Sequence, residues 1–200
     1  NGTAYTFSVV ATNAAGNSAA ATSAAVTPLT VPDAPEITSA SPGATQQVTV
    51  SWTAPADNGG SAITGYTVTA APGGATCTTV STDTDPLSCT VGGLVNGTAY
   101  TFSVVATNAA GNSEVATSAA VTPLTTPDAP VVTSASPAAT QQVTVSWTAP
   151  GNNGGSAITG YTVTANPGGA TCTTASTSCT VGGLVNGTAY TFSVVATNAA

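Results

Sequence analysis

A block of eighteen residues recurs along this chain and limits what the chain can fold into. Residues 1–18 read NGTAYTFSVVATNAAGNS, residues 96–113 repeat them letter for letter, and residues 186–200 begin a third copy. The copies start about 90 to 95 residues apart, which is the length of a small domain rather than of a solenoid unit of roughly 20–50 residues. The chain is therefore predicted to be a tandem array of one domain type that begins and ends within a repeat.

Between these blocks, apolar and polar residues alternate with the period of a β-strand. In the segment QVTVSW, Val48, Val50 and Trp52 fall on one face. In GYTVTA, Tyr66 and Val68 share a face in the same way. Val, Thr, Tyr and Trp suit a pleated, half-buried surface, and Gly-rich turn sequences separate the runs. Several short strands with this spacing predict an all-β sandwich.

Two proline-rich segments divide the repeats and are called the linkers below. Residues 28–35 read PLTVPDAP, and residues 123–130 read PLTTPDAP. Proline fixes φ and stiffens a connecting segment. We therefore expect an extended, semi-rigid string of domains rather than a single compact body.

The combined motifs resemble one known family. The sequence contains Pro-Asp-Ala-Pro, Val-x-Val-x-Trp-x-x-Pro, Gly-Gly-x-x-Ile-x-x-Tyr-x-Val and Leu-x-Asn-Gly-Thr-x-Tyr-x-Phe. Together they resemble the fibronectin type III domain over nearly the whole chain, and the Thr-, Ala- and Gly-rich copies are similar to bacterial secreted versions. The resemblance implies tandem immunoglobulin-like sandwiches of seven strands, in which strands A, B and E face strands C, C′, F and G.

The resemblance also sets the expected domain boundaries. Residues 1–30 would hold only strands F and G, residues 31–125 a complete domain, and residues 126–200 a domain without its last strand. One hypothesis is that the N-terminal segment of one molecule completes the third domain of another, giving head-to-tail strand exchange. The alternative is that the two ends lie loose.

Four pairs of repeat-equivalent residues are assigned to the structural core by the resemblance. Two pairs are strand residues, one pair closes an end of the sandwich, and one pair forms the tyrosine corner, whose hydroxyl binds upstream backbone. The pairs are Trp52 and Trp147 on strand B, Tyr66 and Tyr161 on strand C, Leu94 and Leu184 at the end, and Tyr100 and Tyr190 at the corner.

The four cysteines form two matched pairs that flank the same predicted turn. We expect disulfides between Cys77 and Cys89 and between Cys172 and Cys179, because adjacent strands bring Cβ atoms close enough for such a bond. Structural disulfides imply an oxidising, extracytoplasmic location. A zinc site of four thiolates is the rival interpretation, but it needs two domains to converge and lacks paired C-x-x-C motifs.

Composition excludes several classes of function. The chain contains no Lys, Arg or His and carries a formal charge of −7, so it cannot present a basic surface to nucleic acid or to anionic lipid. No apolar run approaches the roughly 20 residues that span a bilayer. The usual general bases and cationic groups of active sites are missing. We therefore expect no catalytic residue, no cofactor and no enzymatic activity.

Two weaker motifs have alternative interpretations. Asp83 and Asp85 alternate in a short insert and could ligate Ca²⁺, but a calcium site needs more oxygen ligands and the third unit lacks the insert, which favours a solvated loop. Asn1, Asn96 and Asn186 each begin an Asn-Gly-Thr glycosylation sequon. A turn before strand F is the alternative explanation, because Asn and Gly tolerate positive φ.

These observations lead to two functional hypotheses. The first is a non-catalytic spacer or stalk in a secreted or cell-surface bacterial protein, which presents or separates the neighbouring domains of the same longer polypeptide. The second is an adhesion module that binds a cell-surface protein or polysaccharide, as an accessory to a glycoside hydrolase. All ten aromatic residues occupy repeat-equivalent positions predicted to face inward or to form the tyrosine corner. The sequence therefore predicts no aromatic platform for a sugar and favours the spacer.

Overall fold

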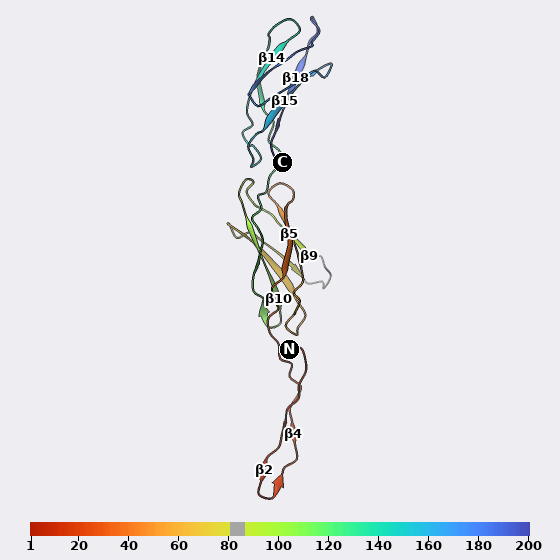
Figure 1. Cartoon of the computed structure of the whole chain (residues 1–200), viewed down its shortest axis with the longest axis vertical. Helices are drawn as coiled ribbons and strands as arrows, with labels where there is room; N and C mark the ends of the chain where they lie inside the picture. The colour runs from red at the N-terminus through yellow and green to blue at the C-terminus, as the bar shows by residue number, and fades with distance from the viewer. Residues whose placement is uncertain (81–86) are drawn as a thin grey trace. The chain divides into compact units, whose positions relative to one another are not determined.

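The computed structural model describes residues 1–80 and 87–200, and every regular element in these ranges is a β-strand. Contacts divide the chain into two compact units. The first comprises Asn1–Ser41, Val48–Gly92 and Tyr100–Val121, and the second comprises Pro42–Gln47, Gly93–Ala99 and Thr122–Ala200. Figure 1 labels strands of both units.

The first unit contains a two-layer sandwich. One layer has the strand order β5-β6-β9, and the other has the order β8-β7-β10, with β11 and β12 both paired to β10. The strands of the first layer are β5 (Glu36–Pro42), β6 (Val48–Thr53) and β9 (Leu87–Val91). The strands of the second are β7 (Gly65–Ala71), β8 (Thr76–Val80), β10 (Thr101–Asn108), β11 (Gly111–Asn112) and β12 (Ala116–Thr117). This arrangement confirms the predicted all-β sandwich with A, B and E facing the other strands.

The alternation seen in the sequence decides which side chains enter this sandwich. Val48, Val50 and Trp52 on β6 are all fully buried, while the Thr and Ser residues between them are partly exposed. The ring of Trp52 lies against that of Tyr66 on β7, with 5.4 Å between the ring centroids. Each fully buried apolar side chain of this size contributes about 1.5–3 kcal/mol of transfer free energy. The alternation therefore places apolar side chains between the two layers, and their burial holds the layers together.

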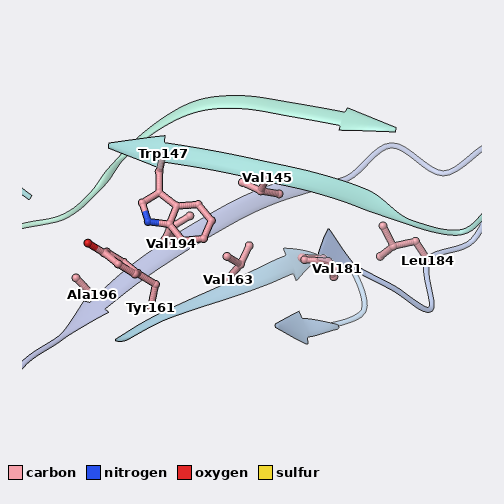
Figure 2. Packing of buried hydrophobic residues seen from close by; sticks show 9 residues of the cluster. Val145, Trp147, Tyr161, Val163, Val181, Leu184, Val194 and Ala196 are labelled. Carbon is pink, nitrogen blue, oxygen red and sulfur yellow. The ribbon is translucent and has the colours of Figure 1, made fainter. Parts of the chain in front are cut away.

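The second unit contains a second sandwich with the same order of strands. One layer is β13-β14-β17, and the other is β16-β15-β18. The strands are β13 (Val131–Pro137), β14 (Val143–Thr148), β15 (Gly160–Asn166), β16 (Thr171–Thr174), β17 (Ser178–Val181) and β18 (Thr191–Thr197). Figure 2 shows Val145 and Trp147 on β14 directed toward Tyr161 and Val163 on β15.

The N-terminal copy of the repeated block forms a hairpin with two short ladders. β1 (Ser8–Val9) pairs with β4 (Ala21–Thr22), and β2 (Thr12–Asn13) pairs with β3 (Gly16–Asn17). All four strands are exposed along their whole length. Phe7 is 60% exposed, whereas its counterpart Phe102 on β10 is 0% exposed. Identical residues thus lie in opposite environments within one chain.

Serine hydroxyl groups complete the edge of β10. The backbone N–H groups of Phe102 and Ala106 donate to the Oγ atoms of Ser118 and Ser113, each at 3.0 Å. The backbone N–H groups of the same two serines donate back to the carbonyl oxygens of Phe102 and Ala106. Each serine therefore binds β10 at two points, although β11 and β12 are only two residues long. The hydroxyl group here replaces the ladder carbonyl of a regular strand.

The two copies of the phenylalanine provide a test of this account. Phe102→Ala should lower the free energy of unfolding by about 3–5 kcal/mol, because it leaves a cavity between two packed layers. Phe7→Ala should change it by no more than about 0.5 kcal/mol, because the ring is already largely in water. Urea unfolding followed by tryptophan fluorescence measures both values. Equal losses in the two variants would mean that the N-terminal hairpin is buried as deeply as β10.

Candidate functional site

The first linker is bound to the loop that joins β6 and β7. The double-glycine loop is defined as residues 57–60 in the first copy and residues 152–155 in the second. The backbone N–H of Thr30 donates to the carbonyl oxygen of Gly59 at 3.0 Å. The N–H of Asp33 donates to the carbonyl oxygen of Asp57 at 2.9 Å. The linker therefore docks on this loop through main-chain groups.

The second linker makes the same pair of hydrogen bonds. The N–H of Thr125 donates to the carbonyl oxygen of Gly154 at 2.9 Å, and that of Asp128 donates to the carbonyl oxygen of Asn152 at 3.0 Å. Gly154 has a φ of +72°, and a Cβ added there would overlap the carbonyl oxygen of Thr125. Glycine is required here both for the backbone conformation and for the close approach of the linker.

Two buried asparagines at this junction were missed by sequence reasoning. Asn108 at the end of β10 is 5% exposed, and Asn198 just after β18 is 9% exposed. The sequence analysis assigned neither of them a role. A signal was available, because both copies place an amide directly after the strand. The linker that binds it lies far away in the sequence, so this contact is not visible from local patterns.

A pair of glycine variants separates linker contact from backbone strain. Gly154→Ala and Gly169→Ala both place a side chain at positive φ, which costs roughly 1–2 kcal/mol. Nothing lies within 4 Å of a Cβ at Gly169, whereas one at Gly154 meets the linker. Gly154→Ala should therefore destabilise the chain by about 1–3 kcal/mol more and should speed amide exchange at Thr125. Urea unfolding and hydrogen exchange measure the two effects, and equal results for the two variants would contradict the linker contact.

Both predicted cysteine pairs are joined by disulfides. Cys77 on β8 is bonded to Cys89 on β9, with 6.2 Å between the Cα atoms. Cys172 on β16 is bonded to Cys179 on β17, with a Cα separation of 6.3 Å. The sequence prediction placed each pair on adjacent strands, and the two strands in fact belong to different layers of the sandwich. Each disulfide thus links the two layers at one edge.

Loss of a layer-linking disulfide should have a measurable cost. The double substitution Cys172→Ser with Cys179→Ser should reduce the free energy of unfolding by about 2–3 kcal/mol, because it removes the constraint on a short loop of the unfolded chain. Chemical unfolding under oxidising conditions measures the difference. Reduction of the parent chain with dithiothreitol should reproduce the loss, and an unchanged transition in the double variant would contradict a stabilising role.

Seven of the eight core residues implied by the family resemblance are buried, and Tyr190 is partly buried. Trp147 and Tyr161 are 4% and 5% exposed, and their ring centroids are 5.3 Å apart. The hydroxyl of Tyr190 accepts a hydrogen bond from the backbone N–H of Val185 at 3.0 Å, which is the geometry of a tyrosine corner. In the other copy Tyr100 is 6% exposed.

The two predicted leucines are buried next to an unusual backbone conformation. Leu94 and Leu184 are 2% and 4% exposed. Their N–H groups donate to the carbonyl oxygens of Gln46 and Gln141 at 3.0 and 3.1 Å. Both glutamines have a φ of 62°, a left-handed conformation that is uncommon for residues other than glycine. In each copy, the turn before β6 or β14 therefore directs a backbone carbonyl oxygen toward the N–H of the leucine.

Two aromatic residues depart from the prediction that every aromatic residue faces inward or forms the tyrosine corner. Tyr5 and Phe7 in the N-terminal hairpin are 50% and 60% exposed. The prediction was wrong there because β1 and β4 form a two-stranded ladder, and the described part of the chain packs no second layer of sheet against it. It assumed that an identical sequence would meet an identical environment.

The remaining motifs lie in turns or outside the described residues. Asn96 and Gly97 form a turn, and the Oδ1 atom of Asn96 accepts a hydrogen bond from the N–H of Gln46 at 3.1 Å. Asp83 and Asp85 lie outside the described residues. Within residues 1–80 and 87–200, no group of three or more His, Cys, Asp or Glu residues is placed to hold a metal ion. The same ranges contain no helix that is long and apolar enough to cross a membrane.

The fold and its repeated core define the class of this protein. The family model of the fibronectin type III domain matches residues 33–123 and 128–200. The chain belongs to the fibronectin type III family.

Three curated bacterial proteins are similar to the chain. Chitinase A1 of Niallia circulans is 40% identical over 126 residues, which cover 59% of the chain and 17% of the chitinase. Exoglucanase B of Cellulomonas fimi is 37% identical over 175 residues, which cover 80% of the chain and 15% of that enzyme. Endoglucanase B of the same organism is 38% identical over 180 residues, which cover 80% of the chain and 16% of that enzyme. The chain thus spans about a sixth of the length of these relatives.

Proposed function

We propose that this chain is a non-catalytic spacer or stalk that presents or separates other domains of a secreted or cell-surface bacterial protein. The observation that carries the proposal is the junction between each linker and the double-glycine loop. Main-chain hydrogen bonds form there at equivalent residues in both copies, with Thr30 on Gly59 and Thr125 on Gly154. Such a junction serves to hold a connecting segment in place and offers no groups for chemistry.

The relatives support a spacer within a multidomain polypeptide. Their names identify one as a chitinase and two as glucanases, and the similarity covers only 15–17% of each. We infer that the protein containing this chain also carries a catalytic domain for polysaccharide hydrolysis. The two disulfides agree with an extracytoplasmic location.

The chain itself is proposed to have no catalytic activity. It lacks Lys, Arg and His, so a serine or threonine hydroxyl would have no basic partner to activate it. We also propose that residues 31–125 form an independent folding unit, with residues 1–30 and 126–200 as parts of neighbouring repeats. A single cooperative transition for residues 31–125 alone would support this division.

An adhesion module that binds polysaccharide is the less favoured function. Sugar platforms use exposed aromatic faces, and the two tryptophans, Trp52 and Trp147, are 0% and 4% exposed. The exposed rings of Tyr5 and Phe7 belong to a hairpin whose sequence is buried in its other full copy. Their exposure therefore follows from the absence of a covering layer rather than from a built binding surface.

A pull-down assay distinguishes the two functions. The chain should remain in the supernatant with insoluble chitin and with cellulose, to the same extent as serum albumin, because its sandwiches present no aromatic platform. Retention of the chain would reject the spacer proposal. The variant Tyr5→Ala with Phe7→Ala serves as the matched control, since retention that it abolishes would assign binding to the hairpin.

A further inference from the structure

The amide groups of Asn108 and Asn198 each join three segments of backbone. The Nδ2 atom of Asn108 donates to the carbonyl oxygen of Thr30 at 2.8 Å and to that of Asn58 at 2.7 Å. Its Oδ1 atom accepts hydrogen bonds from the N–H groups of Ala110 and Gly111 at 2.8 and 3.1 Å. One buried side chain thus connects the linker, the double-glycine loop and the turn after β10.

The second copy repeats this connection. The Nδ2 atom of Asn198 donates to the carbonyl oxygens of Thr125 and Asn153, both at 2.8 Å. Its Oδ1 atom accepts a hydrogen bond from the N–H of Ala200 at 2.9 Å. The acceptors are equivalent in the repeat, so the arrangement is a property of the fold rather than of one loop.

Only an asparagine side chain supplies this set of groups at this length. The site needs two N–H donors directed at two carbonyl oxygens and one acceptor for the following turn. Aspartate would keep the acceptor, but it would place a carboxylate against two carbonyl oxygens in a buried position. Serine or alanine would leave the carbonyl oxygens of Thr30 and Asn58 without this donor, and a buried polar group without a partner is costly.

The N-terminal hairpin contains an equivalent asparagine that makes the Oδ1 hydrogen bond without the Nδ2 hydrogen bonds. Asn13 has the same flanking sequence, and its Oδ1 atom accepts a hydrogen bond from the N–H of Ala15 at 2.8 Å. It is exposed, and the described residues give its Nδ2 atom no linker or double-glycine loop to bind. The turn therefore forms without the Nδ2 hydrogen bonds, and those bonds are specific to the copies that receive a linker.

We propose that Asn108 and Asn198 are positioning residues that fasten each incoming linker to the sandwich that follows it. The proposal deepens the proposed spacer function and rests on it for its biological meaning. The double-glycine loop supplies one carbonyl for the linker N–H, and the asparagine amide binds the linker carbonyl from the other side. The linker is thereby held through both its N–H and its C=O group at a single residue.

Hydrogen exchange in the full chain tests this proposal. Asn108→Asp should increase the exchange rate of the Thr30 and Asp33 amides at least tenfold, because a lost hydrogen bond of about 1.4 kcal/mol corresponds to a factor of ten. The Thr125 amide at the other linker should be unchanged. Asn198→Asp should increase the exchange rate of the Thr125 amide and leave those of Thr30 and Asp33 unchanged. Asn13→Asp should change the exchange rates at neither linker.

Three outcomes would overturn the proposal. The first is an unchanged Thr30 rate in folded Asn108→Asp. The second is an equal rise at Thr30 and at the Val104 amide in the centre of β10, since the asparagine would then support the whole sandwich. The third is unfolding of the affected sandwich in both variants, for the same reason. Retention of the parent chain on chitin or cellulose would reject the spacer function. It would not change the exchange rates expected for these variants, so the two tests can fail separately.

Discussion

The packing of one β-layer against another is the interaction on which the rest of this structure depends. The repeated block forms the eight-residue strand β10, where Phe102 is fully buried. The equivalent residues of the hairpin form only the two-residue strands β1 and β2, and Phe7 is exposed there. The letters are identical, so intrinsic propensity is the same in both places. Burial of the alternating face against a second layer accounts for the difference, in keeping with the strong dependence of strands on context.

Neutral side chains make several of the polar connections of this chain. Ser113 and Ser118 complete the edge of β10, and Asn108 connects three backbone segments, all without a formal charge. With no Lys, Arg or His, the chain cannot use side-chain ion pairs. Hydrogen bonds between neutral groups are little affected by the ionic screening that weakens exposed charge pairs.

Much of the sandwich could be predicted because its information is local. The alternation around Val48 and Trp52 has the period of two that a half-buried strand requires, and the paired cysteines flank a predicted turn. The role of Asn108 could not be predicted, because its partner Thr30 is 78 residues away. The exposure of Tyr5 and Phe7 was also missed, since it depends on whether a second layer covers the hairpin.

The use of main-chain acceptors at the junctions has a consequence for the history of the array. The amide of Asn198 binds the carbonyl oxygens of Thr125 and Asn153. Every residue, proline included, carries such an oxygen whatever its side chain is. A gene in which whole repeats are gained or lost by unequal recombination would encode a new junction with the same acceptors already in place. Repeat number can therefore change in one genetic step, without compensating substitutions at the joins.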